Sequence, residues 1–263
     1  MNWLKLAKRC CSLHAKRKKR TQLDRFYALR SLGEILLPEY RFKWPQMDWW
    51  YDEEFNSYLR RFDEIDGMNC DRRWMLRELL RLVSSVPGDT AECGVFSGSS
   101  SYLICQANTN ASVAVKKHHM FDSFEGLSNP SEHDGEHWTK GDLSYGLEKV
   151  KHNLREFDPH TGYYAGWIPE RFDDVRDLKF SFVHIDVDLY EPTRDSLAFF
   201  YDRMSPGGII LIDDYGMTTC PGATKAGDEV LADKPEGMMR LSGGAGFIIK
   251  GTPTQCVTTR AAA

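Results

Sequence analysis

The stretch KFSFVHIDVDLYEPTRDSLAFFYDRMSPGGIILIDDYG, residues 179–216, contains two short apolar runs on either side of a segment with helical spacing. The runs at 179–188 and 207–214 have the continuous apolar character of strands buried on both faces of a sheet. Between them, residues 190–204 predict a helix with Pro192 in its first turn. A strand, a helix and a strand in this order indicate a right-handed βαβ unit, in which the carboxyl ends of the two strands are neighbours.

The same alternation continues on both sides of this unit. Strands are predicted at TAECGVF, KHHMFDSFEG and GYYAGWIPERF, and helices at SGSSSYLICQAN, YGLEKVKHNLREF and TKAGDEVLAD. Short strands that alternate with helices predict an α/β fold, a parallel sheet with helices on both faces. Two further strands, GMMRLSG and AGFIIKG, have only SGGA between them, which is too short for a crossover helix. We therefore expect an antiparallel hairpin at the end of a doubly wound sheet.

The remainder of the chain divides by composition. Residues 1–20 carry eight basic groups and no acid, so we predict a solvated basic tail whose functional partner would be an anionic surface such as a membrane. No nucleic-acid partner is expected. Residues 21–88 have helical spacing around an aromatic, proline-broken stretch and predict an N-terminal helical extension. Residues 89–251 are the predicted α/β core, and residues 252–263 are a C-terminal tail.

Cysteine usage and hydropathy together indicate a cytoplasmic protein. The seven cysteines are scattered, without a CxxC pair or a Cys/His grouping that has zinc spacing. An odd number of thiols and the lack of a signal-peptide pattern are typical of a reducing compartment. Because no apolar run reaches 18 residues, no membrane-spanning helix is expected. Attachment at the membrane periphery would depend on the basic tail alone.

Polar residues at the carboxyl ends of the strands are the candidates for a site, because ligands bind there in open α/β sheets. The turn ECGVFSGSS would let a ligand approach the backbone and the N–H groups that begin a helix, but it lacks GxGxxG, so no dinucleotide site is indicated. Asp122 ends the next strand, where a carboxylate can accept hydrogen bonds from both hydroxyls of a ribose. A turn-capping role for Asp122 is the alternative.

Four of the strand-end residues are acids on two strands that should be neighbours: Asp186, Asp188, Asp213 and Asp214. Like charges brought together cost free energy unless something offsets them. A hard divalent cation such as Mg²⁺, which takes oxygen ligands and needs only a few carboxylates, would do so. Protonation, or the capping of turns and helix N-termini, would offset the charge without a metal, and the residues alone leave these alternatives open.

Several longer sequence motifs together match the pattern of a known family. In chain order they are PGDTAECGVFSGSSS, FDSFEGL, KGDLSYGLEKVKHNL, GWIPERF, HIDVDLYEPTRDSL, SPGGIILIDDYG and CPGATKAGDEV. From about residue 71 to residue 251 the chain resembles the TylF/MycF (macrocin O-methyltransferase) family of class I S-adenosylmethionine-dependent O-methyltransferases, which methylate sugar hydroxyls. The first word departs from the family, which usually has paired glycines there, because Ser99 replaces one of them. The resemblance implies the Rossmann-like, seven-stranded class I methyltransferase fold with a C-terminal antiparallel hairpin.

The resemblance also implies where S-adenosylmethionine would bind. The first turn would hold the donor, the next strand end its ribose, and the third strand end its adenine. The residues implied for these contacts are Glu92, Gly94, Ser97 and Gly98 for the turn, Asp122 and Ser123 for the ribose, and Gly166 and Trp167 for the adenine.

Mg²⁺ is the second cofactor that the resemblance implies, with Asp186, Asp213 and Asp214 as ligands. The metal would lower the pKa of a sugar hydroxyl bound to it, and a carboxylate beside the hydroxyl would accept the proton. Asp186 is implied as that base as well as a ligand. Asp188 is the competing base, because strand alternation directs its side chain the same way.

The predicted activity is therefore S-adenosylmethionine-dependent, Mg²⁺-assisted methyl transfer to a hydroxyl, of a sugar in a glycoside, natural product or glycan. Two alternatives stay open: a metal-dependent O-methyltransferase with a catechol-like acceptor, and a non-catalytic S-adenosylmethionine-binding partner subunit. Members of the family are often dimeric or larger, so the resemblance also implies a homo-oligomer.

Overall fold

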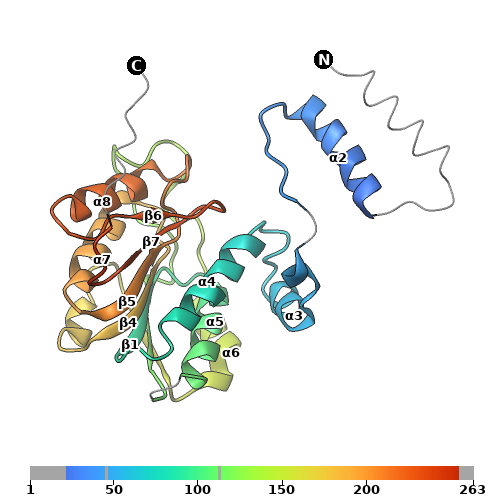
Figure 1. Ribbon diagram of the computed structural model, residues 1–263. Coiled ribbons are helices and arrows are strands. Elements are labelled where there is room, and N and C mark those ends of the chain that lie inside the picture. Colours follow the sequence, from blue (N-terminus) through green and yellow to red (C-terminus); the bar gives the residue numbers. More distant parts are fainter. Residues whose placement is uncertain (1–21, 45–46, 112–113, 255–263) are drawn as a thin grey trace. The chain divides into compact units, whose positions relative to one another are not determined.

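The computed structural model describes residues 22–44, 47–111 and 114–254 (Figure 1). The chain divides into two compact units between Arg61 and Phe62. The basic tail at residues 1–20 lies outside the described residues, so its proposed contact with an anionic surface stays a prediction. No described helix combines the length and the apolar character that crossing a membrane requires.

The first unit contains the helix α2 (Gln22–Leu36), the short 3-10 helix η1 (Asp48–Tyr51) and the helix α3 (Glu53–Arg61). Aromatic rings hold part of it together. Phe26 on α2 packs edge-on against Phe42 and Trp44, at ring-centroid distances of 6.4 and 6.1 Å. The aromatic stretch that breaks the helical spacing thus contains η1 and serves as packing within this unit.

The second unit is built on a seven-stranded sheet in the order β3-β2-β1-β4-β5-β7-β6. The strands β1 to β5 pair in parallel, whereas β7 runs antiparallel to both β5 and β6. The strand bounds are β1 (Asp89–Cys93), β2 (His118–Asp122), β3 (Thr161–Ala165), β4 (Phe180–Ile185), β5 (Met204–Ile212), β6 (Met239–Arg240) and β7 (Gly246–Ile249). The predicted doubly wound sheet and its terminal antiparallel hairpin are confirmed.

Helices cover both faces of this sheet. Figure 1 shows α4, α5 and α6 on one side and α7 and α8 on the other. Their bounds are α4 (Cys70–Leu82), α5 (Ser99–Thr109), α6 (Leu147–Leu154), α7 (Tyr190–Tyr201) and α8 (Pro221–Leu231), with the 3-10 helices η2 (Arg155–Phe157) and η3 (Phe172–Val175) in the connections. Phe180, Leu197 and Phe200 belong to the buried cluster on the α7 side, and Met120, Val150 and Leu154 to a cluster near α5 and α6.

Two details differ from the sequence prediction. The helix α4 packs against α5 and belongs to the unit that contains the sheet, whereas composition groups it with the N-terminal segment. Its apolar face has the same helical spacing as the preceding helices, so periodicity alone does not reveal the partner. The predicted turn SPGG lies inside β5, which begins at Met204. The pairing of β4 with β5 shifts register there, and Gly207 takes a φ of 82°.

The register of the sheet sets the positions of the strand ends. Cys93 on β1 is level with Ile185 on β4, and Ile185 is level with Ile212 on β5. Gly94, with a φ of 81°, therefore lies against the backbone carbonyl of Asp186, and any Cβ there would collide with that oxygen. The Gly94 turn and the acids that follow β4 and β5 are thus brought to one edge.

Candidate active site

A cavity of about 400 Å³ opens at the carboxyl ends of the parallel strands. Its volume lies within the range usual for small-molecule sites. Seven of the residues predicted from the sequence line it: Gly94, Asp122, Ser123, Trp167, Asp186, Asp188 and Asp214. Trp138, Leu143 and Phe96 add apolar wall, while Ser99 and Ser100 add the first turn of α5. Ser99, which stands where the family usually has a glycine, is the first residue of that helix.

Five predicted residues lie outside the cavity lining: Glu92, Ser97, Gly98, Gly166 and Asp213. Gly98 precedes α5 as its N-cap with a φ of 80°, and the Ser97 carbonyl accepts a hydrogen bond from Asn153 at 2.9 Å. Asp213 is one residue behind Asp214, with 2% of its surface exposed. Glu92 is completely buried between β2 and β4, where its carboxylate meets two histidines.

Asp122 fastens the Gly94 turn to the end of β2. Its Oδ2 accepts the backbone N–H groups of Val95 at 2.6 Å and Phe96 at 3.3 Å, and its Oδ1 accepts that of Phe124 at 2.6 Å. Burial raises the pKa of Asp122 above its ordinary value, although these hydrogen bonds act in the opposite direction. A carboxylate has about four acceptor positions, so Asp122 combines the turn-capping role with remaining capacity toward the cavity.

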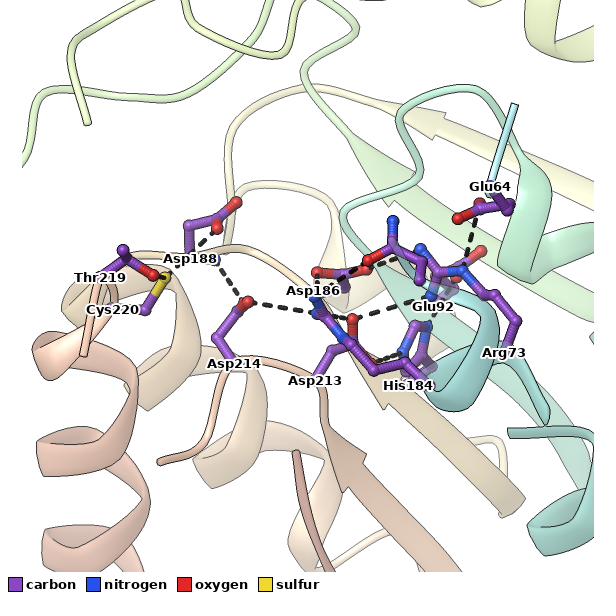
Figure 2. Close-up of polar contacts among 12 residues, drawn as sticks. Glu64, Arg73, Glu92, His184, Asp186, Asp188, Asp213, Asp214, Thr219 and Cys220 are labelled. Atoms are coloured by element: carbon purple, nitrogen blue, oxygen red, sulfur yellow. Dashed lines mark hydrogen bonds and ion pairs between the residues drawn. The ribbon is translucent and has the colours of Figure 1, made fainter. Parts of the chain in front are cut away.

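Two arginines from α4 lie among the acids at the ends of β4 and β5. The Arg72 guanidinium pairs with Asp213 and comes within 3.9 Å of Asp186 and 3.5 Å of Asp214. Arg73 approaches Asp186 and Asp213, both at 3.7 Å. Figure 2 shows Arg73 beside the acids of the two strands. The repulsion between the acids is therefore offset in part by guanidinium groups, which is a third solution beside protonation and a cation.

The acids fall into two groups with potential to bind a metal. His184, Asp186 and Asp213 each offer one atom within 4.8 Å of the others, and so do Asp188, Asp214 and Cys220. Within the second group, the Asp188 N–H donates to Asp214 Oδ2 at 3.0 Å. Figure 2 shows Asp214 between Asp188 and Asp213. Two of the predicted ligands, Asp186 and Asp213, thus belong to the first group and the third, Asp214, belongs to the second, while all three contact the Arg72 guanidinium.

Burial and mutual repulsion perturb this second group strongly. Burial, followed by the charges of Asp214 and Asp186, raises the pKa of Asp188 to about 8. Burial and the charge of Asp186 raise the pKa of Asp214 to about 6, against the opposing effect of Arg72. Without further positive charge, this edge of the sheet carries more carboxylates than it can hold ionised. Such strongly perturbed acids in a cavity are typical of functional sites.

Arg72 and Arg73 are not among the site residues predicted from the sequence, where their segment indicates only the start of a helix. A usable signal was present. Arg73 shares the helical spacing of Leu76 and Leu80, which face the core. Arg73 itself is 7% exposed and donates to buried Glu64 at 3.2 Å. A charged residue on the apolar stripe of a helix is costly to bury without partners, so its position indicates acids on the facing element.

Trp138 comes from the long segment between β2 and α6. Its Nε1 donates to the Sγ of Cys220 at 3.3 Å, and the Cys220 thiol lies 3.5 Å from Asp188 Oδ1. In the same segment, Asp134 Oδ1 accepts the Tyr190 N–H at the start of α7, at 2.6 Å. This segment is therefore held by side-chain bonds beside the acids, and it contributes part of the cavity wall.

Comparison with known proteins agrees with this arrangement of turn, acids and sheet. Residues 70–229 match the family model described as Macrocin-O-methyltransferase (TylF). The chain belongs to the TylF family. Its resemblance to that family, predicted from the sequence words, is confirmed.

Among its relatives is the 8-demethyl-8-(2,3-dimethoxy-alpha-L-rhamnosyl)-tetracenomycin-C 4'-O-methyltransferase of Streptomyces olivaceus, 31% identical over 54% of this chain. Another is the demethyldecarbamoylnovobiocin O-methyltransferase of Streptomyces niveus, 30% identical over 57% of this chain. The matched regions span 58% and 60% of those two proteins. The solved structure of the O-methyltransferase NovP covers 69% of this chain and 80% of its own, at 27% identity and a TM-score of 0.57. The predicted class I methyltransferase fold is thereby confirmed.

Proposed function

We propose that this TylF-family protein transfers a methyl group from S-adenosylmethionine to a sugar hydroxyl of a glycoside, natural product or glycan. One observation carries the proposal: acids from the ends of β4 and β5 face a cavity of about 400 Å³, beside the Gly94 turn. The family supports O-methyl transfer, and the rhamnosyl group in the name of the Streptomyces olivaceus relative supports a sugar acceptor.

The cavity has features that suit S-adenosylmethionine, which supplies the methyl group when bound. The N-terminus of α5, with Ser99 and Ser100 at the wall, favours a carboxylate such as that of the donor's amino-acid part. Asp122 accepts three backbone N–H groups and has acceptor capacity left for one ribose hydroxyl. Trp167 in the cavity lining is an aromatic side chain for the adenine. Glu92, by contrast, is buried too deeply to reach a ligand in the cavity.

The acids also suit a divalent cation. Asp186, Asp213 and Asp214 would hold Mg²⁺, a hard ion that prefers carboxylate oxygens. In the described part of the chain, the carboxyl groups of Asp186, Asp213 and Asp214 face the two guanidiniums of Arg72 and Arg73, and Arg73 also pairs with Glu64, so negative charge is left for a cation to balance. When bound, such an ion lowers the pKa of a coordinated hydroxyl.

Asp186 is the residue we propose as the base that accepts the proton of the acceptor hydroxyl. Its side chain is 21% exposed, whereas those of Asp213 and Asp214 are 2% and 5% exposed. Asp188 is the competing base, but it is 7% exposed and lies within reach of the Cys220 thiol. Arg72 and Arg73 would orient the Asp186 carboxylate, and the apolar wall would keep water from the methyl donor.

Methyl transfer from isotopically labelled S-adenosylmethionine to a panel of acceptors tests the proposal. The panel holds glycosides with free sugar hydroxyls, a catechol, and non-glycosylated matches of each glycoside. We expect label on the sugar of at least one glycoside, loss of transfer in excess chelator, and recovery with Mg²⁺. Transfer to the catechol alone would overturn the sugar assignment, and full activity in chelator would overturn the metal. If calorimetry shows no S-adenosylhomocysteine binding, the enzyme proposal is wrong.

A further inference from the structure

One buried histidine has an unused ring nitrogen beside the acids of the candidate active site. His184 lies on β4, two residues before Asp186, and has no exposed surface. Its Nδ1 lies 2.8 Å from the carboxylate of Glu92 on the neighbouring strand β1. Its Nε2 is excluded from solvent and makes no hydrogen bond in the described part of the chain. A buried polar atom without a partner costs free energy, so this nitrogen requires an explanation.

The contact with Glu92 assigns the hydrogen of the His184 ring to Nδ1. The same carboxylate accepts the hydroxyl hydrogen of Ser101, so it acts as an acceptor and Nδ1 of His184 is the donor. A neutral imidazole with its hydrogen on Nδ1 has a lone pair on Nε2. Nε2 is therefore an acceptor or a metal ligand, and it does not donate to a neighbouring carboxylate.

A second acceptor, Asp213 Oδ1, lies 3.5 Å from Nε2 of His184. A hydrogen bond from a protonated ring would bring the two atoms to about 2.7–3.2 Å. A water molecule that donated to both atoms would hold them about 4.4 Å apart, since each acceptor would lie about 2.8 Å from the water oxygen. Two atoms bound at about 2.1 Å to one tetrahedral ion lie about 3.4 Å apart. The separation in the structure thus agrees with an ion between the two acceptors.

Asp186 completes a group of three, because His184, Asp186 and Asp213 each offer one ligand atom within 4.8 Å of the others (Figure 2). The guanidiniums of Arg72 and Arg73 do not use every acceptor of this group. Asp213 meets both guanidiniums through Oδ2, whereas its Oδ1 faces the imidazole. The Asp186 carboxylate lies 3.9 Å from one guanidinium and 3.7 Å from the other, beyond hydrogen-bond distance. Asp186 also lines the cavity, so it connects the group to the space where a ligand would bind.

We propose that His184 Nε2, Asp186 and Asp213 bind a divalent transition-metal ion such as Zn²⁺, with Glu92 as the hydrogen-bonding partner that orients the imidazole. The inference rests on the proposed function, because it takes Asp186 and Asp213 as metal ligands, but it adds a nitrogen ligand and changes the kind of ion. Mg²⁺ takes oxygen ligands, whereas imidazole suits Zn²⁺ and similar ions. Mg²⁺ would then bind the same carboxylates more weakly.

Two general features of metal sites support this assignment. A ligating histidine almost always donates its other ring N–H to a carboxylate, a carbonyl or a water, as His184 does to Glu92. Zinc sites in enzymes have three protein ligands and keep one further position open. The group of His184, Asp186 and Asp213 supplies three ligands, two of them behind the cavity wall and one in it.

Calorimetry on the whole chain, with Zn²⁺ alone and with Mg²⁺ alone, tests the assignment without an acceptor. We expect the wild-type protein to bind Zn²⁺ about 100-fold more tightly than Mg²⁺, or tighter still. His184→Gln can still donate to Glu92 but lacks the imidazole nitrogen. Its Zn²⁺ affinity should fall by about 100-fold, since altering even a group behind a ligand changes metal affinity about 10–100-fold. Its Mg²⁺ affinity should change by less than about threefold, because the carboxylates remain.

Two variants serve as controls for the calorimetry. His118→Gln is the matched histidine change, because His118 also contacts Glu92, while its Nδ1 meets the Thr90 hydroxyl at 2.9 Å. It should lower the melting temperature and keep both metal affinities at the wild-type values. Cys220→Ser removes the thiol of the other group with potential to bind a metal. It should also keep the wild-type Zn²⁺ affinity.

Nuclear magnetic resonance of protein with ¹⁵N-labelled histidine identifies the ligand atom. Without metal, the wild-type protein should show one histidine with its hydrogen on Nδ1 and a bare Nε2, and His184→Gln should lack that histidine. Zn²⁺ should shift this Nε2 resonance and leave the hydrogen on Nδ1. A purely structural role for His184 would lower the melting temperature of the variant, but it would not make this resonance respond to Zn²⁺.

The outcomes separate this inference from the proposed function. Wild-type protein that binds neither ion overturns the proposed metal site and the nitrogen ligand with it. Mg²⁺ binding as tight as Zn²⁺ binding, without a shift at Nε2, overturns the role of His184 alone. Zn²⁺ binding that is lost in Cys220→Ser and kept in His184→Gln also overturns that role. If His184→Gln does not fold, His184→Asn is measured in its place, and the response of the wild-type Nε2 resonance to Zn²⁺ still decides.

Discussion

The buried carboxylate of Glu92 and the acids that follow β4 and β5 lie on either side of His184, and their charges are balanced in different ways. Inside the sheet, the single carboxylate of Glu92 receives hydrogen bonds or ion pairs from His118, His184 and Ser101. At the carboxyl ends of the strands, here called the mouth, the acids that follow β4 and β5 (Asp186, Asp188, Asp213 and Asp214) lie beside two guanidiniums, those of Arg72 and Arg73. A carboxylate whose partners are all protein groups can act only on its neighbours. Acids in excess over their protein partners, beside a cavity, are available to a cation or a proton.

The pKa directions express the same difference. The partners of Glu92 overcome its burial and hold its pKa well below the ordinary value. At the mouth, burial and the repulsion between like charges outweigh the effect of Arg72, and they raise the pKa of Asp188 to about 8 and that of Asp214 to about 6. Ionisation therefore stabilises the fold at Glu92 and opposes it at Asp188. Four substitutions test this contrast, beginning with the one expected to act most strongly.

Replacing Asp186 by Asn should give the largest effect, because it removes the proposed base at the exposed end of the mouth. We expect kcat for methyl transfer to fall on the order of 10³-fold, the middle of the range for a general base, while thermal stability changes little. The measurement is single-turnover transfer of labelled methyl with a glycoside acceptor. Asp173→Asn is the control, since Asp173 is a surface acid, 74% exposed, that pairs with Arg176 away from the cavity lining. An Asp186→Asn enzyme with near-normal kcat would shift the base to Asp188.

Arg72→Gln should have the next largest effect, on stability. Arg72 is 15% exposed and is the guanidinium shared by Asp186, Asp213 and Asp214. Removing one partner of a buried ion pair costs about 3–5 kcal/mol, so we expect a loss near the lower limit in the free energy of unfolding, measured with urea in chelator. Mg²⁺ should then raise the melting temperature of the variant more than that of wild type, because the cation replaces lost positive charge.

The control for this comparison is Arg81→Gln on the same helix. Arg81 is 74% exposed and pairs with Glu78 on the surface, so its loss should change the free energy of unfolding by less than about 0.5 kcal/mol. Equal losses in the two variants would mean that Arg72 contributes through helix α4 in general and not through the acids.

The arrangement of the strands that carry these acids could be predicted from the sequence, because it depends on local periodicity. The apolar runs that end in Asp186 and Asp213 predict adjacent parallel strands, and the pairing of β4 with β5 is confirmed. Short connections likewise predict the antiparallel hairpin of β6 and β7, which is also confirmed. These features depend on residues near one another in the chain, or on connection rules that hold for most sheets.

The spacing of Arg73 indicates that it meets acids, but the sequence does not identify which acids, since the arginines come from a distant element. Arg72 comes from a helix 141 positions before Asp213, and nothing in the spacing of that helix names the sheet end it faces. Glu92 shows the complementary difficulty. It lies near the end of β1 in a motif shared with the family, yet its side chain points toward His184 on the neighbouring strand and away from the cavity. Which way a strand-end residue points depends on the exact end of the strand, which sequence patterns define poorly.

Glu92→Gln tests the interior side of the contrast through acid stability. Because the folded pKa of Glu92 is lowered, its ionisation stabilises the fold fully above the unfolded value of about 4.3 and progressively less as the pH falls below it. At pH 7 the variant should therefore lose about 2 kcal/mol in the free energy of unfolding, the cost of weakening hydrogen bonds to a buried charge. The gap between variant and wild type should narrow between pH 4.5 and pH 3, following roughly the titration of an unfolded carboxyl. A gap that stays constant with pH would contradict an ionised Glu92.

Asp188→Asn should change the pH dependence of stability with the opposite sign. The folded pKa of Asp188, about 8, lies above the unfolded value of about 3.9. Between these values the folded protein binds more protons, so wild-type stability falls as the pH rises toward 8 and then levels off. Asn cannot ionise, so in chelator the variant should gain on wild type as the pH rises from 5 to 8, by up to about 1.4 kcal/mol for each pH unit. Asp202→Asn, at the exposed end of α7, should show no such trend.

Mg²⁺ should cancel the gain in stability of Asp188→Asn over wild type, because a cation at the mouth favours the ionised acids that burial disfavours. If Asp188→Asn instead lost stability with rising pH, the mouth would hold balanced charge like the interior, and the contrast between the two groups of acids would fail.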